Sequence, residues 1–178
     1  MSQKTKIKSY ILIFCCIAFF IAVLDYYVKC FIEGFPIWAD ISSFWFVKIT
    51  HLRNYGGAFS ILQNATVLLA AFGIIVPAVV ILFFRKAMLD DFRYLLSCAC
   101  VCGGAWGNLA DRLLYGYVVD YISVGTFPVF NISDSFITCG AVALGILILL
   151  EKPDSDKFDA AKKNVSEKVS DNDEGKKV

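Results

Sequence analysis

Residues 103–136 read GGAWGNLADRLLYGYVVDYISVGTFPVFNISDSF, beginning inside one long apolar run and ending at the start of another. Two carboxylates stand between these runs: Asp120 in the β-branched segment YVVDYI, and Asp134 just before the second run. Because Gly125 and Pro128 allow sharp reversals of the chain, one loop can fold the two side chains face to face. This layout indicates an acid/base pair of carboxylates.

Further polar side chains follow at the end of the first apolar run. Asn108, Asp111 and Arg112 are spaced i, i+3 and i+4, so they share one face of the last turn if the run is a helix. We expect Asp111 to hold Arg112. Candidates for positioning the carboxylates and a substrate backbone are Asn54, Asn108, Arg112 and Asn131. Polar residues at helix ends are also commonly caps or headgroup contacts, and the spacing alone leaves that alternative open.

The composition is that of a membrane protein. Of the 178 residues, 58% are hydrophobic and only 19% are charged, which exceeds what a soluble core needs. The basic residues are not clustered with aromatic ones, so no nucleic acid partner is expected. The cysteines lie mostly inside apolar runs, where they are expected to be small hydrophobic residues. The single histidine, His51, lacks partners for a zinc site, so we expect no metal or cofactor and a hydrogen-bonded interfacial histidine.

Four apolar segments have the length of a membrane-spanning helix: residues 9–28, 65–84, 94–112 and 132–150. Lysines before the first segment resemble the start of a signal peptide, but bulky residues occupy the positions where cleavage needs small ones, so a retained helix is predicted. The third segment is rich in small residues, which predicts a slim helix packed centrally. We therefore expect an all-α membrane protein with one four-helix domain, 1–150, and a disordered charged tail, 151–178.

The segment between the first two predicted helices is aromatic and partly polar, as is typical of a membrane interface. Its stretch WFVKIT, residues 45–50, alternates apolar and polar side chains with the period of a strand. We expect a small β or amphipathic cradle lying on the outer membrane surface. A glycine-rich turn, NYGGAFS, closes it, and Asn54 in that turn offers both hydrogen-bond donors and an acceptor.

The placement of basic residues predicts the topology. Thirteen of the 17 Lys and Arg residues lie before the first helix, between the second and third helices, or in the tail, and four lie in the other two loops. Cytoplasmic segments carry such an excess, so both termini of this multi-pass chain are expected in the cytoplasm. Asn54, Asp120 and Asp134 then lie on the outer side. Asn131 is expected to cap the fourth helix, with Asp134 in its first turn.

Four blocks in order along roughly residues 7–150 resemble the lipoprotein signal peptidases, the membrane aspartyl proteases called signal peptidase II. The blocks are Asp25-x-x-x-Lys29, Asn54-x-Gly56-x-Ala58-Phe59, GNLADR with GYVVDYI (residues 107–112 and 116–122), and FNISDS (residues 130–135). Two small uncharged residues depart from the family pattern: Ser133 stands where Ala is usual, and Ala110 where Ile is common.

The resemblance implies that Asp120 and Asp134 are the catalytic pair and that Asp25 and Lys29 brace the active site. The residues expected to support the site or bind substrate are Asn54, Gly56, Asn108, Asp111, Arg112, Asn131, Asp25 and Lys29. The implied substrate is a bacterial prolipoprotein, cut just before its diacylglyceryl cysteine in the bacterial cytoplasmic (inner) membrane. Membrane lipid is a further expected partner, no cofactor is implied, and a monomer is expected.

The chemistry of such a pair follows from Coulomb repulsion. Two carboxylates about 4 Å apart repel by about 4 kcal/mol at an effective dielectric near 20, which separates their two pKa values by roughly three. One proton then stays on the pair near neutral pH, so the charged member can deprotonate water while the protonated member polarises a carbonyl. The alternative is a small multi-span proton-coupled transporter or channel component. It fits less well, because a proton relay needs ionisable groups along the spans.

Overall fold

The computed structural model of the protein describes residues 3–57 and 65–151. Its helices are α1 (Gln3–Glu33), α2 (Thr66–Phe84), the short α3 (Ala87–Asp90), α4 (Phe92–Tyr115) and α5 (Ile132–Leu150). Its strands are β1 (Asp40–Phe44), β2 (Val47–Asn54), β3 (Val118–Val124) and β4 (Phe127–Phe130). The tail expected beyond Glu151, and Ala58 and Phe59 of the glycine-rich turn, lie outside the described residues. The chain divides into one compact unit, Met1–Ile146, and a second, Leu147–Val178, of which the last residues of α5 are described.

Three of the helices in the described part of the chain are long and apolar enough to cross a membrane: α1, α2 and α5. Helix α4 has 24 residues, but it is not among them. The reason is its composition, since Asn108, Asp111 and Arg112 near its end are polar or charged and its centre contains several glycines. The structure therefore confirms three of the four predicted spans by length and composition.

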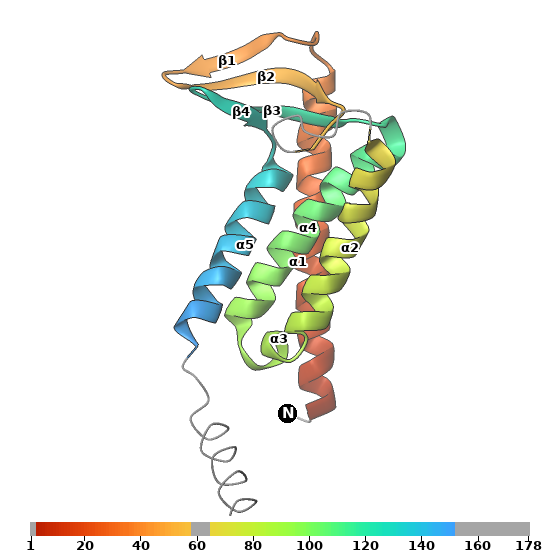
Figure 1. The fold of residues 1–178 in the computed structure, drawn as a ribbon, viewed down its shortest axis with the longest axis vertical. Coiled ribbons are helices and arrows are strands. Elements are labelled where there is room, and N and C mark those ends of the chain that lie inside the picture. Colours follow the sequence, from red (N-terminus) through yellow and green to blue (C-terminus); the bar gives the residue numbers. More distant parts are fainter. Residues whose placement is uncertain (1–2, 58–64, 152–178) are drawn as a thin grey trace, which may run out of the picture. The chain divides into compact units, whose positions relative to one another are not determined.

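Helix α4 packs against both α1 and α2, in agreement with the slim central helix that its small residues predict (Figure 1). A Cβ added at Gly103 would lie 2.7 Å from the Ala18 carbonyl oxygen of α1. Gly140 of α5 approaches α4 as closely, because a Cβ there would lie 2.7 Å from the Ser97 carbonyl oxygen. Glycine is required wherever two backbones come this near.

The small β part is a four-stranded antiparallel sheet in the order β1-β2-β3-β4. The strand predicted at residues 45–50 is confirmed for residues 47–50, which lie in β2, whereas Trp45 and Phe46 form the turn between β1 and β2. The sheet is larger than expected. Asp120 lies within strand β3, opposite Leu52 of β2, and not in the loop that the sequence predicted. The correction has a local cause: Gly116, with φ of 80°, ends α4, and the β-branched residues that follow favour a strand.

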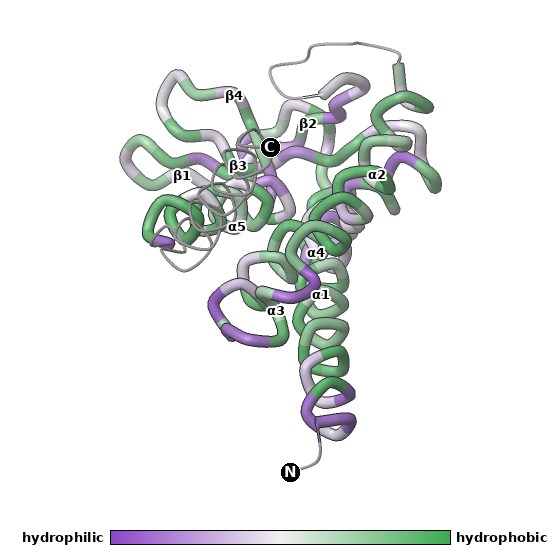
Figure 2. The backbone as a smooth tube through the Cα atoms, turned by 60° about the horizontal axis from the view of Figure 1, so that its bottom comes forward, coloured by the Kyte–Doolittle hydropathy of each residue, from purple (hydrophilic) through white to green (hydrophobic). Residues whose placement is uncertain are grey.

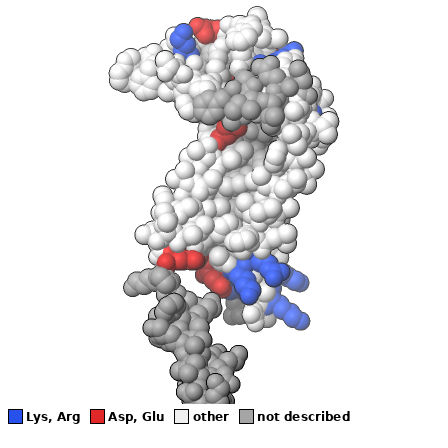
Figure 3. Space-filling model, viewed as in Figure 1, with Lys and Arg blue, Asp and Glu red and all other residues white. Residues whose placement is uncertain are grey.

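The exposed surface is apolar along the helices and charged at their ends. Figure 2 shows apolar residues continuing along α1, α2 and α5, and many of these side chains are exposed, such as Phe19, Val67 and Phe83. Exposed apolar surface of this extent fits acyl chains better than water. Lys and Arg side chains gather at the end of the helices away from the sheet (Figure 3). The exposed basic residues of those helix ends and the α2–α3 connection are Lys4, Lys6, Lys8, Arg85, Lys86 and Arg93.

Candidate active site

Strand β3 positions Asp120. Its neighbours Val119 and Tyr121 pack with Ile32 of α1 in a buried apolar cluster, which fixes one face of the strand. Successive side chains point to opposite faces of a strand, so Asp120 points away from that cluster. The side chain is buried, with only 2% of the residue exposed. A carboxylate there must find hydrogen-bond donors within the protein.

The donors on Asp120 are two amides. Asn131 Nδ2 donates to Asp120 Oδ1 over 2.8 Å, and Asn54 Nδ2 donates to Oδ2 over 2.9 Å. Asn54 Oδ1 accepts from the Gly56 N–H over 2.9 Å, so the same side chain stabilises the turn that follows β2. The predicted double role of Asn54 as donor and acceptor is confirmed.

The first turn of α5 positions Asp134. Asn131 Oδ1 accepts from the Asp134 N–H over 2.9 Å, and the Asn131 N–H donates to Asp134 Oδ2 over 3.3 Å. This reciprocal pair is a capping box with Asp at its third position, and it confirms Asn131 as the N-cap. Asn108 Nδ2 donates to the other oxygen, Asp134 Oδ1, over 2.7 Å.

Asn108 and Asn131 connect the two carboxylates to each other. The Asn131 amide also contacts Asn108 Oδ1, over 3.1 Å, so the amides of α4 and of the α5 cap form one chain between Asp134 and Asp120. Four of the predicted site residues are thereby brought together from β3, α4 and the start of α5. The described residues include no group of three His, Cys, Asp or Glu side chains able to hold a metal ion.

The electrostatic setting of Asp120 favours its protonated form. Burial raises the pKa of the Asp120 carboxyl to about 7, and the nearby negative charge of Asp134 adds to this effect. Hydrogen bonds from Asn54 and Asn131 and the positive charge of Lys29 act in the opposite direction. A carboxyl with this pKa can gain or lose a proton near neutral pH, as general acid/base chemistry requires.

Arg112 is placed differently from the prediction. Its Nη1 donates to the Asn108 carbonyl oxygen over 3.3 Å, and its Nη2 donates to the Gly56 carbonyl oxygen over 3.2 Å. The predicted Asp111–Arg112 pair is wrong, because adjacent residues of a helix do not face each other. Arg112 instead ties the turn after β2 to the last turns of α4.

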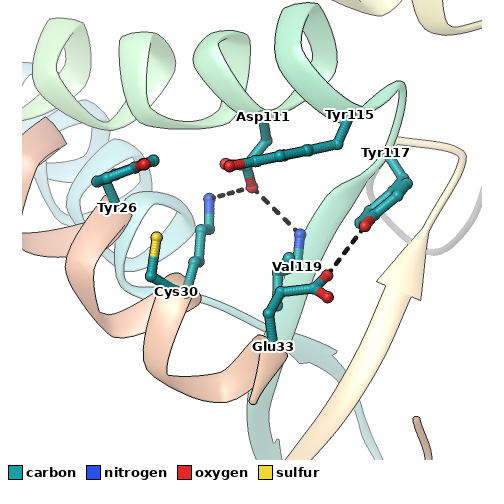
Figure 4. A pocket seen from close by; sticks show the side chains of 8 residues that line it. Tyr26, Cys30, Glu33, Asp111, Tyr115, Tyr117 and Val119 are labelled. Atoms are coloured by element: carbon teal, nitrogen blue, oxygen red, sulfur yellow. Dashed lines mark hydrogen bonds and ion pairs between the residues drawn. The ribbon is translucent and has the colours of Figure 1, made fainter. Parts of the chain in front are cut away.

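Asp111 belongs to a buried ionic cluster centred on Lys29. The Lys29 ammonium lies 2.6 Å from Asp25 Oδ2, and it donates to Asn108 Oδ1 over 2.9 Å. It also lies 2.9 Å from Asp111 Oδ2, an ion pair that Figure 4 draws as a dashed line. Asp25 and Lys29, spaced i and i+4 on α1, thus form a buried ion pair. The Lys29 ammonium has three N–H donors, and its three acceptors are Asp25, Asp111 and the Asn108 amide oxygen. The nitrogen of the same Asn108 amide donates to Asp134. The cluster is therefore connected to Asp134 through Asn108.

A cavity of about 220 Å³ adjoins this cluster and is lined by two of its members, Lys29 and Asp111. Figure 4 shows Asp111 and Tyr115 of α4 facing Tyr26, Cys30 and Glu33 of α1 across it. Neither Asp120 nor Asp134 lines it, so it is separate from the carboxylate pair. Tyr117 and Val119 line it as well.

Several polar contacts outside the carboxylate pair were not predicted. Tyr121 and Ser133 contact Asp25, while Glu33 binds Arg53 and accepts from the Tyr117 hydroxyl. The sequence carried no periodic signal for these contacts, because each joins residues distant in the chain. His51, predicted at the interface, is buried, and its Nδ1 lies 2.8 Å from the Phe35 carbonyl oxygen.

Buried Asp120 and half-buried Asp134, joined through amides, resemble the carboxylate pair of aspartic proteases, and they lie in a chain whose apolar helices have membrane-spanning length. Comparison with known proteins agrees: the profile of the family Signal peptidase (SPase) II matches residues 17–150, and the chain belongs to this family. The protein is therefore a membrane protease, and a transporter or channel component is not favoured.

Individual relatives support the assignment. The lipoprotein signal peptidase of Caldicellulosiruptor bescii is 39% identical over 132 residues, which cover 72% of this chain and 85% of that protein. The lipoprotein signal peptidase of Streptococcus agalactiae serotype Ia is 40% identical over 108 residues, covering 60% of this chain and 70% of that protein. A bacterial membrane enzyme structure solved by the in meso method at 2.3 Å resolution superimposes with a TM-score of 0.71 at 32% identity, covering 80% of this chain and 88% of that chain.

Proposed function

We propose that the protein is a lipoprotein signal peptidase of the bacterial inner membrane and that Asp120 and Asp134 are its catalytic pair. It removes the signal peptide of a prolipoprotein by hydrolysing the bond before the diacylglyceryl-modified cysteine. The observation that carries the proposal is the chain of amides by which Asn131 and Asn108 join Asp120 to Asp134. Family membership supports the substrate class.

The aspartyl mechanism uses one proton shared by the pair. The ionised carboxylate takes a proton from water, whose oxygen attacks the scissile carbonyl carbon, while the protonated carboxyl donates a hydrogen bond to the carbonyl oxygen. The C–N bond then breaks, and the pair delivers a proton to the leaving amine. The two carboxyls titrate as a unit, so the proton belongs to the pair and not to one residue. The raised pKa of Asp120, about 7, supports a shared proton at neutral pH.

The supporting residues have separate tasks in this proposal. Asn54 and Asn131 orient Asp120, and Asn108 orients Asp134. Arg112 holds the carbonyl oxygen of buried Gly56, which fixes the turn beside Asp120 where a substrate backbone would lie. The Asp25–Lys29–Asp111 cluster holds Asn108 from behind.

The membrane arrangement is also a proposal. Helix α4 also spans the membrane, as the third of four spans in a single domain, residues 1–150, and is shielded from lipid by the helices around it. Both termini lie in the cytoplasm, because exposed basic residues gather at the helix ends away from the sheet. The sheet and the carboxylate pair lie at the outer face, where Trp38 and Trp45, 76% and 87% exposed, would meet the membrane interface. The domain works as a monomer.

This depth explains the lipid requirement of the substrate. Asp134 lies in the first turn of α5 and Asp120 lies in strand β3 of the sheet, so neither carboxylate is at the middle of a helix and the scissile bond has to be held near the membrane surface. Each buried methylene favours the membrane by about 0.8 kcal/mol, so two long acyl chains fix the peptide bond beside them at this depth. A signal helix alone fixes the depth less sharply.

The test compares two forms of one precursor in the same bilayer at matched membrane concentration. We expect the precursor with a diacylglyceryl cysteine to be cleaved far faster than the same precursor with an unmodified cysteine. Equal initial rates would show that the lipid is not recognised. A reporter inserted at Asp40 is expected outside the cytoplasm, and a reporter found inside would overturn the proposed orientation.

A further inference from the structure

Ser133 of α5 and Asp25 of α1 are joined by two hydrogen bonds in the interior. The Ser133 hydroxyl donates to Asp25 Oδ2 over 2.7 Å, and the Ser133 N–H donates to Asp25 Oδ1 over 3.2 Å. Neither residue has any exposed surface. A charge-assisted hydrogen bond of this length, shielded from water, is stronger than one between neutral groups.

Asp25 connects three elements through these contacts. Its Oδ2 also contacts Lys29 Nζ, on its own helix, and its Oδ1 is 3.5 Å from the Tyr121 hydroxyl on β3. The same Tyr121 hydroxyl accepts from the N–H of Ile132, over 3.2 Å. The N–H groups of Ile132 and Ser133 are both in the first turn of α5. Asp25 and Tyr121 therefore fix the position and rotation of that turn.

The rotation of the first turn decides where the Asp134 carboxylate points. Asp134 follows Ser133 directly, and its carboxylate must meet Asn108 Nδ2, which is 2.7 Å away on a different helix. The side chains of Ser133 and Asp134 keep a fixed angle of about 100° around the helix axis. A small rotation of the turn at Ser133 therefore carries the Asp134 oxygens with it and moves them away from Asn108 Nδ2.

Helix α4 closes over the Ser133 hydroxyl. A Cβ added at Gly107 would collide with the Ser133 hydroxyl and would lie 3.0 Å from Asp25 Oδ2. The absence of a side chain at position 107 therefore leaves room for the Ser133 hydroxyl, and a side chain there would displace it.

We propose that Ser133 is a positioning residue for peptide hydrolysis, because its hydroxyl and Asp25 lock the first turn of α5 in the rotation that presents Asp134 to Asn108 and Asp120. The inference rests on the proposed function of the Asp120–Asp134 pair. It assigns to this chain's own serine a role in the turnover step and none in substrate binding.

The central test is Ser133→Ala, assayed on a diacylglyceryl-modified precursor in a bilayer. We expect kcat per folded enzyme to fall about three- to tenfold with KM unchanged, since one charge-assisted hydrogen bond is lost and the backbone hydrogen bond stays. Ser97→Ala is the matched control, because Ser97 is a buried helix serine whose hydroxyl bonds the Arg93 carbonyl oxygen, at the other end of α4. It should leave kcat unchanged.

A second pair of variants tests the same hydroxyl by crowding it. Gly107→Ala should lower kcat more than Ser133→Ala, because the new methyl group pushes the hydroxyl and the α5 turn aside. In the double variant Gly107→Ala/Ser133→Ala the nearest colliding atom is gone, so kcat should recover towards that of Ser133→Ala alone. Losses that simply multiply would contradict the proposed contact.

The outcomes distinguish the positioning role of Ser133 from the proposed function of the protein. A wild-type enzyme that does not cleave the lipidated precursor would overturn the proposed function itself. A cleaving wild type with an unchanged kcat in Ser133→Ala, or with a loss that appears only in melting temperature, would overturn the positioning role alone. If Ser133→Ala does not fold, Tyr121→Phe decides, because it removes the other side-chain contact to the same turn. An unchanged kcat in Tyr121→Phe would contradict the proposal that contacts to the first turn of α5 orient Asp134.

Discussion

Asn131 donates its side-chain amide to Asp120 over 2.8 Å from the position that caps the next helix. The same residue therefore orients one carboxylate through its amide nitrogen and begins the helix that carries the other, Asp134. Asn131 therefore contributes both to the stability of α5 and to the orientation of Asp120, and suitable substitutions should separate these two contributions.

Substitution of Asn131 by Ser and by Ala makes that separation. Serine is a good N-cap, so Asn131→Ser should melt close to the wild type, while Asn131→Ala should lose about 1 kcal/mol of unfolding free energy. Neither side chain reaches Asp120, so both variants should lose kcat, by roughly tenfold or more. Thermal melting and turnover of the two purified variants check this. A serine variant with wild-type turnover would show that the amide on Asp120 is dispensable.

The raised pKa of Asp120 predicts how stability depends on pH. In the folded state this carboxyl keeps its proton up to a pKa of about 7, whereas an unfolded Asp loses it near 4. Between these values the folded state binds more protons, so the unfolding free energy falls as pH rises through this window.

Asp120→Asn removes this titration. Its melting temperature should match that of the wild type near pH 4 and exceed it by several degrees at pH 8, where the wild type carries the full cost of the buried charge. Melting curves of both proteins across pH 4 to 8 measure the difference. A constant difference over this range would mean that Asp120 does not titrate with a raised pKa.

Lys29 lies between two buried carboxylates, so its removal should be costly. Lys29→Met leaves Asp25 and Asp111 without their shared cation, and a loss of about 3–5 kcal/mol is expected. Adding Asp111→Asn to this variant should restore part of the stability, because one uncompensated charge disappears.

The control for this prediction is Lys48→Met. Lys48 also pairs with a carboxylate, that of Asp40, but both side chains are at least half exposed. Its loss should cost less than about 1 kcal/mol. Denaturant unfolding of the three variants compares them, and a Lys29→Met protein as stable as Lys48→Met would contradict the buried cluster.

The membrane helices were predictable because length and apolar composition alone define them. The segments predicted at 65–84 and 132–150 agree with α2 and α5 within a residue. Helix α4 was placed less well at its end, because the sequence pattern stops at Arg112 while the helix continues to its C-cap, Gly116. Helix α1 also extends past its predicted end at residue 28 to Glu33, because the buried Asp25–Lys29 ion pair lies within the helix and does not end it.

The candidate site residues were predictable from family motifs, and local contacts such as the Asn131 cap were too, but the long-range partners were not. Asn54 and Asp120 are 66 positions apart, and the strand pairing that joins them follows from no local pattern. Lys29 meets Asp111 across two helices for the same reason. Sequence spacing suggested that Asp111 holds Arg112, and only the direction of the side chains around α4 excludes this pair. Long-range packing, and not local propensity, decides these contacts.

Turnover of Asp120→Asn and Asp134→Asn on a diacylglyceryl-modified precursor tests the proposed mechanism most directly. Each variant removes a charge or a proton that the pair must exchange, so kcat should fall at least about a hundredfold in each. Thermal melting confirms that the variants are folded, and Asp40→Asn, which neutralises an exposed carboxylate, serves as the control with unchanged turnover. Near wild-type turnover in either folded variant would contradict the assignment of Asp120 and Asp134 as the catalytic pair.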